Sequence, residues 1–244
     1  MRYLLFSCAL LVRTLESAGL QAANFRTRNF IASAPSRQLA REFCEAAERS
    51  RSALAEKWLG EKLADWRMPC SIRIEPDPHA PSQGMTSFAF RHGQPHDCEM
   101  FLSGEATMCP ESVLPHEVMH MILATYYGRP IARWIDEGIC TVIESPAERK
   151  KHDRQVRRML DRSRHMRLEQ LFHAEDYPRD VTTFYMQSYS VTHYLVTQGG
   201  PQKLLAFVDD ADQLKDWNAA LRRHYGISSI AQLEQTWQRS LQQP

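Results

Sequence analysis

The chain has 244 residues, of which 43% are apolar, and a formal net charge of +1. This length fits one domain or two closely associated lobes, and the apolar fraction is sufficient for a full core. A nearly neutral chain gives no indication of nucleic-acid binding, and no apolar run is long enough to span a bilayer stably.

The first 23 residues have the features of a cleaved secretory signal peptide. Arg2 supplies the positive charge, residues 3–12 form a short apolar run, and small residues follow, so that cleavage after Gly19 or Ala23 is expected. An ordinary N-terminal helix is the alternative, because charged residues interrupt the pattern. The signal predicts export to the periplasm or the extracellular space, and leaves residues 24–244 as the mature domain.

A small β-sheet lobe is predicted over about residues 24–110. Residues 25–32 alternate in polarity as a strand does, and an apolar stripe predicts a helix from Pro35 to about Leu63. Further strands are predicted at residues 71–75, 85–90 and 99–102.

The segment that begins at Leu114 contains the motif His-Glu-x-x-His. Pro115 favours a helix start and Gly128 a helix end. On a helix, His116 and His120 lie one turn apart on the same face and can bind one metal ion. Glu117, beside them, is placed to take a proton from a metal-activated water.

A second buried helix is predicted over residues 132–144. A catalytic zinc site needs three protein ligands and one open position, and Glu137 follows His120 by seventeen residues, which is enough for one connecting loop. Asp136 is the competing carboxylate. It points about 100° away from Glu137 around the helix, so we expect it to be a surface or capping residue.

These two segments, His-Glu-x-x-His at 116–120 and Trp-x-x-Glu-Gly at 134–138, resemble the gluzincin metallopeptidases, especially the peptidase-MA-like group and its aminopeptidases. The resemblance implies one Zn²⁺ per chain with Glu137 as its third ligand, and a peptide or protein substrate. It also implies that Thr141 and Glu144 contact the ligand residues and not the metal, with Glu144 accepting a hydrogen bond from a ligand histidine.

The resemblance further implies that a strand before the metal-binding helix forms the rim of the cleft and pairs with an extended substrate. Residues 85–90 and 99–102 are both candidates for this strand. The Gly-x-Met-x-Asn strand of the aminopeptidases has only a distant counterpart here, at residues 84–88. Aminopeptidase activity is therefore not predicted.

A tyrosine hydroxyl can stabilise the oxyanion that develops during peptide hydrolysis, and the predicted helix over residues 184–195 offers two. By the resemblance to the aminopeptidase segment Tyr-x-Lys-Gly, Tyr185 is the first candidate, with Tyr189 one turn later as its rival. Both can equally be core aromatics. His193 is a third possibility, because some gluzincins use a histidine donor.

Basic residues dominate residues 148–166, where apolar residues at helical spacing interrupt them. This pattern favours a solvated helix face over a polyanion-binding site. Further helices are predicted at residues 202–208, 217–225 and 230–241. Cys140 is expected to be a buried free thiol, and an exported chain can bridge two of Cys70, Cys98 and Cys109.

Together these observations predict an α+β, zincin-like fold, with a small N-terminal β-sheet lobe, active-site helices over residues 111–146 and a helical C-terminal lobe over residues 147–244. The predicted function is zinc-dependent hydrolysis of peptide bonds. A non-catalytic, zinc-containing binding protein on a peptidase-like scaffold is the main alternative, and a polyanion-binding helical module is a third.

Overall fold

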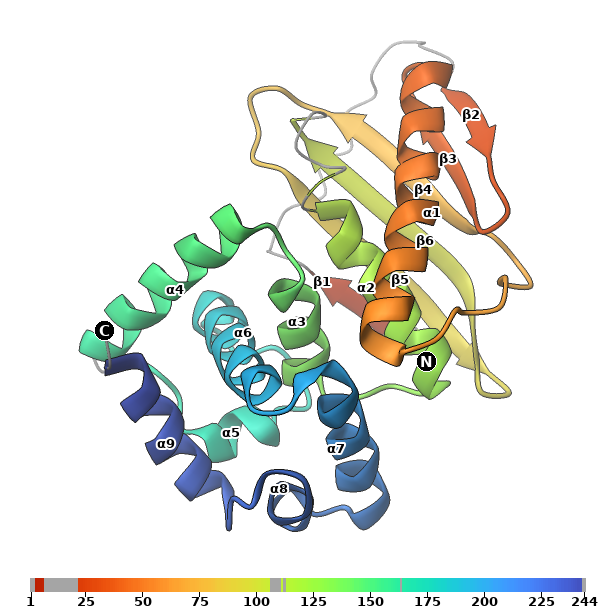
Figure 1. Ribbon diagram of the computed structural model, residues 1–244. Helices are drawn as coiled ribbons and strands as arrows, with labels where there is room; N and C mark the ends of the chain where they lie inside the picture. Colours follow the sequence, from red (N-terminus) through yellow and green to blue (C-terminus); the bar gives the residue numbers. More distant parts are fainter. Residues whose placement is uncertain (1–2, 7–21, 106–110, 112, 163, 243–244) are drawn as a thin grey trace. The chain divides into compact units, whose positions relative to one another are not determined.

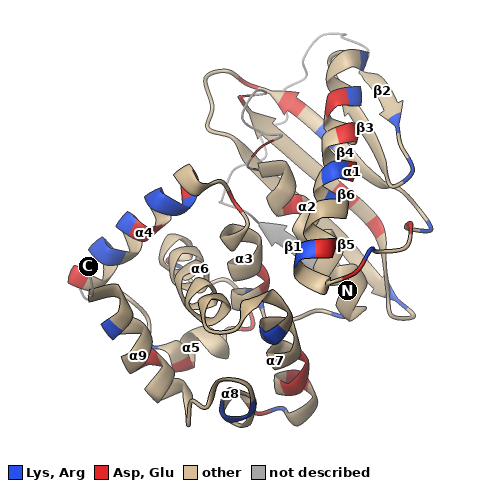
Figure 2. Cartoon of the chain, in the orientation of Figure 1, with Lys and Arg blue, Asp and Glu red and all other residues tan. Residues whose placement is uncertain are grey.

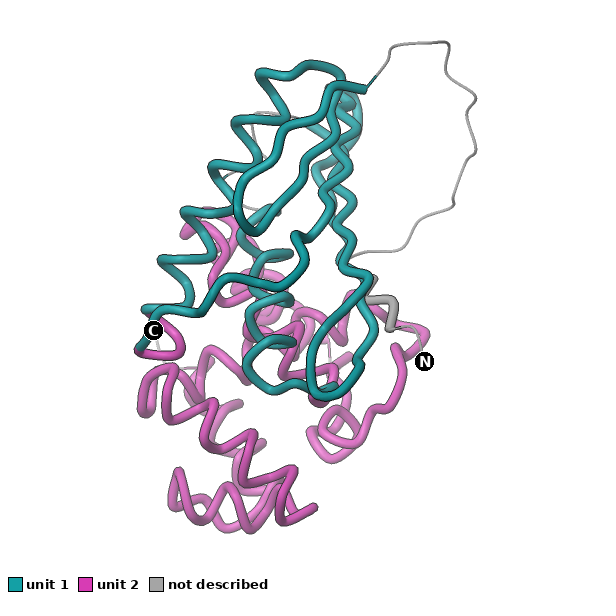
Figure 3. The backbone as a smooth tube through the Cα atoms, turned by 90° about the vertical axis from the view of Figure 1, so that its right-hand side faces the viewer, with its two compact units in different colours: residues 1–56, 61–130 teal, residues 57–60, 131–244 magenta. Residues whose placement is uncertain are grey.

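The computed structural model describes residues 3–6, 22–105, 111, 113–162 and 164–242. The chain divides into two compact units, each treated by itself below (Figure 3). Unit 1 comprises Met1–Glu56 and Glu61–Pro130, and unit 2 comprises Lys57–Gly60 and Ile131–Pro244. All strands lie in unit 1, and unit 2 is helical, so the fold is α+β as the zincin-like prediction requires.

A mixed six-stranded sheet forms the framework of unit 1. Its strands are β1 (Tyr3–Phe6), β2 (Ala23–Arg26), β3 (Phe30–Ala34), β4 (Cys70–Pro76), β5 (Gln83–Arg91) and β6 (Gln94–Gly104). Their order is β1-β5-β6-β4-β3-β2, with β4 parallel to both of its neighbours and the other pairs antiparallel. Residues along β4 are alternately buried and exposed over most of its length, as expected when one face of a sheet is covered.

Helix α1 (Arg37–Leu59) and helix α2 (Leu114–Tyr127) lie on the same face of this sheet (Figures 1 and 3). The buried side chains of β4 and β6, among them Ile72 and Met100, belong to the core of unit 1. The side chain of Glu117 accepts a hydrogen bond from β5, and helix α2 contacts both β5 and β6, so the strand that forms the rim of the cleft stays a prediction.

Two boundaries differ from the sequence prediction. Residues 25–32 form the hairpin of β2 and β3 instead of one strand, because the backbone N–H of Thr27 donates to the carbonyl of Phe30 (2.9 Å) and closes a turn. Helix α1 ends at Leu59 instead of Leu63, because Gly60 adopts a left-handed conformation (φ 78°) that stops a helix.

Strand β6 begins five residues earlier than predicted. His92 and Gly93 both have positive φ angles, 51° and 70°, and connect β5 to β6. Two consecutive left-handed residues match the twist of a two-residue hairpin turn, so pairing continues to Arg91 and Gln94.

Unit 2 is built around one central helix. Its helices are α3 (Arg133–Val142), α4 (Pro146–Asp161), α5 (Leu168–Phe172), α6 (Val181–Thr197), α7 (Gly200–Leu214), α8 (Trp217–Tyr225) and α9 (Ile230–Gln242). Helix α6 contacts α3, α4 and α7. The core includes stacked rings of Trp134 and Phe172, whose centroids are 4.0 Å apart. The helices predicted in this half of the sequence are confirmed.

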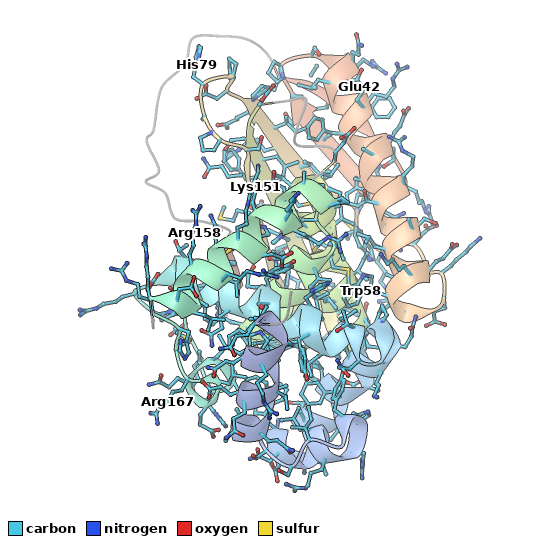
Figure 4. All side chains as sticks on the ribbon, turned by 60° about the vertical axis from the view of Figure 1, so that its left-hand side comes forward. Glu42, Trp58, His79, Lys151, Arg158 and Arg167 are labelled. Atoms are coloured by element: carbon cyan, nitrogen blue, oxygen red, sulfur yellow. The ribbon has the colours of Figure 1, made fainter. Side chains whose placement is uncertain are left out.

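The basic segment forms α4, whose Lys and Arg residues are distributed along the helix (Figure 2). Lys151 and Arg158 extend away from it and are exposed (Figure 4), whereas Val156 and Met159 are buried. This distribution confirms a solvated face with an apolar underside. Across the described residues, no helix combines the length and hydropathy needed to cross a bilayer.

Some predictions concern residues that the structure does not describe. Residues 7–21, the greater part of the predicted signal peptide, are outside the described ranges, as is Cys109. Residues Tyr3–Phe6 of the same segment form strand β1 and not a helix. Cys70 and Cys98 have free thiols, and Cys140 is a buried free thiol as expected.

Candidate active site

Helix α2 of unit 1 carries the His-Glu-x-x-His motif, and the side chains of the motif are buried. Pro115 occupies its first turn, and Gly128 ends it in a left-handed conformation, with its N–H donating to the carbonyl of Ala124 (3.0 Å). His116 and His120 are only 4% and 1% exposed, and their ring centroids are 5.1 Å apart. One ring nitrogen of each lies within 4.8 Å of the other, so the two imidazoles can share a metal ion.

Glu117 lies against strand β5. The hydroxyl of Thr86, which is fully buried, donates to Oε2 of Glu117 (2.5 Å). A Cβ at Gly84 would lie 2.5 Å from Oε1 of Glu117 and 2.6 Å from a methyl carbon of Val113. Strand β5 therefore both orients this carboxylate and leaves the space that it occupies.

Glu137, the predicted third metal ligand, lies in unit 2. It is fully buried in α3, and two phenol hydroxyls donate to its Oε1, that of Tyr177 at 2.5 Å and that of Tyr185 at 3.1 Å. Burial, followed by the charge of Glu137, raises the pKa of both tyrosines far above the ordinary value. Both phenols consequently remain protonated donors at neutral pH.

A model of the peptidase MA superfamily matches residues 105–243, more than half of the chain. The chain belongs to the peptidase MA superfamily. No curated protein matches it significantly. The matched region includes α2 and α3 and therefore every candidate metal ligand, whereas the sheet precedes it.

In this peptidase superfamily member, several predicted site residues lie together within their own unit. His116, Glu117 and His120 share α2, and Tyr185 contacts Glu137 in unit 2. The hydroxyl of Thr141 donates to the backbone carbonyl of Glu137, one turn earlier (2.8 Å). The Thr141 side chain is therefore bonded to the backbone of α3, the helix that carries the Glu137 carboxylate.

Two other predicted residues, Tyr189 and Glu144, have partners on α4. The hydroxyl of Tyr189 donates to Oδ1 of Asp153 (2.9 Å), and Glu144 lies 2.9 Å from Nε2 of His152. His193 stacks on Tyr189, with ring centroids 5.7 Å apart. The Tyr189 hydroxyl is therefore bonded to Asp153, whereas the Tyr185 hydroxyl is bonded to Glu137.

The prediction that Asp136 is a surface residue is wrong. Asp136 is only 8% exposed, because α3 is enclosed on all sides and residues Trp134 to Val142 are all buried. The angular argument assumed that this helix has a solvent face.

Helix α3 also approaches α6 closely, since a Cβ at Gly138 would collide with the Thr192 side chain and the carbonyl of Ser188.

Sequence analysis missed Thr86, Gly84 and Tyr177. The first two belong to residues 84–90, which the sequence predicts as a strand and as a candidate rim of the cleft, but with no role for these two side-chain positions; the small residues there were the available signal. Tyr177 lies between α5 and α6, outside any periodic pattern, and nothing in the sequence marked it.

Proposed function

We propose that this protein is a zinc-dependent peptidase of the gluzincin type, with His116, His120 and Glu137 as zinc ligands and Glu117 as general base. One observation carries the proposal: the two buried imidazoles of α2 lie one turn apart beside the buried carboxylate of Glu117 on the same helix, in a chain that belongs to a peptidase superfamily. Buried ionisable groups at this density are costly unless they are paired or bind a metal.

The donor atoms fit zinc. Two imidazole nitrogens and one carboxylate oxygen form a common catalytic zinc set, which leaves a fourth position open. When bound, zinc would polarise the scissile carbonyl and lower the pKa of a water molecule to about 7. Cys140, one turn after Glu137, is also buried and offers a sulfur atom that metals bind, so it is the alternative third ligand.

The side chains of the protein would move the proton and stabilise the developing charge. Glu117, held by Thr86, accepts a proton from the attacking water and then delivers it to the leaving amine. The Tyr185 hydroxyl, which stays protonated, donates to the oxyanion. Tyr189 is the second choice, because its hydroxyl is already bound to Asp153.

Glu117→Gln tests the assignment of the base. We expect this variant to retain zinc and to lose activity by about 10²- to 10⁴-fold, the usual contribution of a general base. The measurements are zinc content by elemental analysis and cleavage of a mixed peptide library with product sequencing. Glu45→Gln, the same change at an exposed position of α1, is the control. Undiminished cleavage by Glu117→Gln would refute the role of the base.

A pair of variants tests the third ligand. Glu137→Gln should lose zinc and activity together, whereas Cys140→Ser should keep both. The opposite result would assign the ligand to Cys140. Zinc retention by a wild-type protein that cleaves no peptide in the library would favour the alternative of a non-catalytic zinc-containing binding protein.

Export is a separate part of the proposal. It is supported by the signal-like pattern of residues 1–23. Expression of the full chain in a bacterium with fractionation and mass measurement tests it. We expect a shortened chain in the periplasm, cut near Gly19 or Ala23, and an intact chain confined to the cytoplasm would overturn it.

A further inference from the structure

We propose that Tyr177 is a positioning residue that holds the carboxylate of Glu137 ready to bind the metal. This inference rests on the proposed function, because it takes Glu137 to be a metal ligand. Tyr177 has no place in the sequence motifs, and its assignment comes from its contacts within unit 2.

The ring of Tyr177 is held by three neighbours although it lies in a connection between helices. It stacks on Tyr185, with centroids 5.8 Å apart and planes at 21°. The guanidinium of Arg133 lies 4.9 Å from the ring centroid, and Phe184 meets it edge-on at 5.7 Å. These contacts restrict the ring, so the direction of its hydroxyl is fixed before any metal arrives.

That hydroxyl is aimed at the candidate ligand. It donates to Oε1 of Glu137 at 2.5 Å, a shorter distance than the 3.1 Å from the Tyr185 hydroxyl to the same oxygen. Both hydrogen bonds use Oε1, so neither uses Oε2. A carboxylate bound in this way keeps one rotamer and can present its second oxygen to a metal without first losing conformational freedom.

The two tyrosines therefore have different tasks. Tyr177 has the shorter bond and a ring held by Arg133, which suits a constant support for Glu137. Tyr185 has the longer and weaker bond, so its hydroxyl can leave Glu137 for the substrate at smaller cost. Tyr177 acts through Glu137 and is assigned no contact with the substrate.

Zinc affinity of the purified full chain, measured by competition with a fluorescent chelator, tests the inference. Tyr177→Phe should weaken zinc binding by about 10- to 100-fold, the usual effect of removing a residue that orients a ligand. Tyr225→Phe is the matched control, because Tyr225, like Tyr177, is a half-buried tyrosine, and its ring packs on Phe207 of α7; it should change the affinity less than about twofold.

Two further measurements separate the hydroxyl from general packing. Tyr177→Leu removes the ring as well, so a hydroxyl role predicts a zinc affinity close to that of Tyr177→Phe, although the zinc-free Leu variant melts at a lower temperature. In a Glu137→Gln background, Tyr177→Phe should cause no additional loss of affinity.

The possible results distinguish this inference from the proposed function. If the wild type binds zinc tightly and Tyr177→Phe binds it equally well, the positioning role is overturned while the peptidase proposal stands. If only Tyr177→Leu weakens binding, ring packing is responsible and the role of the hydroxyl is overturned. A wild-type protein that binds no zinc overturns the proposed function and this inference with it.

Discussion

The hydroxyl of Thr86 on β5 donates a 2.5 Å hydrogen bond to Oε2 of Glu117 on α2, and both residues are almost completely buried. A charge-assisted hydrogen bond of this kind is short and directional. It connects the strand beside the motif to the residue that we propose as general base, so β5 fixes the position of this carboxylate.

Replacing Thr86 should therefore reduce turnover without removing the metal. We expect Thr86→Val, which preserves shape but lacks the hydroxyl, to lower kcat by about 10-fold, since a misplaced base transfers protons less efficiently. Peptide-cleavage kinetics and zinc content are the measurements. Thr86→Ser keeps the hydroxyl and is the control. Equal kcat for the Val and Ser variants would contradict the orienting role.

Gly84 should tolerate no side chain. An alanine Cβ there would come within 2.5 Å of Oε1 of Glu117, closer than van der Waals contact allows, so the carboxylate must move. A displacement of about 1 Å at a catalytic group costs about 10²-fold in rate, and we expect Gly84→Ala to lose activity on that scale. Gln83→Ala, the adjacent position on β5, should remain active. Comparable kinetics for the two variants would show that Glu117 does not need this space.

Sequence reasoning succeeded where the determining signals are local. The ends of α2 follow from Pro115 and Gly128 within one short segment, and the facing histidines follow from helical spacing alone. The two strands of the 25–32 segment were merged, because nothing in the alternation of polar and apolar residues marks the turn at Thr27–Phe30, where Asn29 is bound by Glu48 of α1 from nineteen positions away.

Only part of the site was predicted, again because the sequence shows local signals and not long-range contacts. Tyr177 is forty residues from Glu137 and belongs to no periodic element, so its contact appears only once unit 2 is folded. The assignment of Asp136 to the surface failed because a helix that is enclosed on all sides has no solvent-exposed face. Local periodicity identifies helices, and tertiary packing decides what surrounds them.

Asn29 should be important for the stability of unit 1. Its backbone N–H and Nδ2 donate to Glu48 at 2.7 and 2.9 Å, and its Oδ1 accepts from the N–H of Trp66 at 2.8 Å. Asn29→Ala keeps the backbone bond but removes the side-chain hydrogen bonds to the half-buried Glu48 and Trp66, and we expect a loss of about 3 kcal/mol in the free energy of unfolding. Urea denaturation measures it. Asn24→Ala, at an exposed position of β2, should change stability little, and similar midpoints for both variants would contradict the prediction.

Asp65, which accepts a hydrogen bond from Asn29, should make the stability of unit 1 depend on pH in the acid range. Hydrogen bonds from Asn29 and Arg28 lower the pKa of Asp65 below its ordinary value. A group with a lowered folded-state pKa contributes stability above its unfolded pKa and loses it as the pH falls through the folded value. We expect the stability difference between wild type and Asp65→Asn to be present at pH 6 and to shrink below about pH 4. Urea midpoints across this range measure the difference, and a constant difference would exclude this linkage.

Gly138 is the position at which α3 and α6 are in closest contact. A Cβ there would meet the side chain of Thr192 and would lie 2.6 Å from the carbonyl oxygen of Ser188. The Thr192 side chain can be shortened, but the helix backbone cannot yield in the same way. Gly138→Ala should therefore push the two helices apart, and with them Glu137 and Tyr185.

We expect Gly138→Ala to lower the melting temperature by about 5 °C, which corresponds to about 1–3 kcal/mol of overpacking in a protein of this size, and to weaken zinc binding. Adding Thr192→Ala should restore part of the melting temperature, because it removes one of the two clashes, whereas Thr192→Ala alone supplies the baseline. Calorimetry of the single and double variants measures these melting temperatures. A Gly138→Ala protein as stable as wild type would mean that α3 and α6 are not in contact at this point.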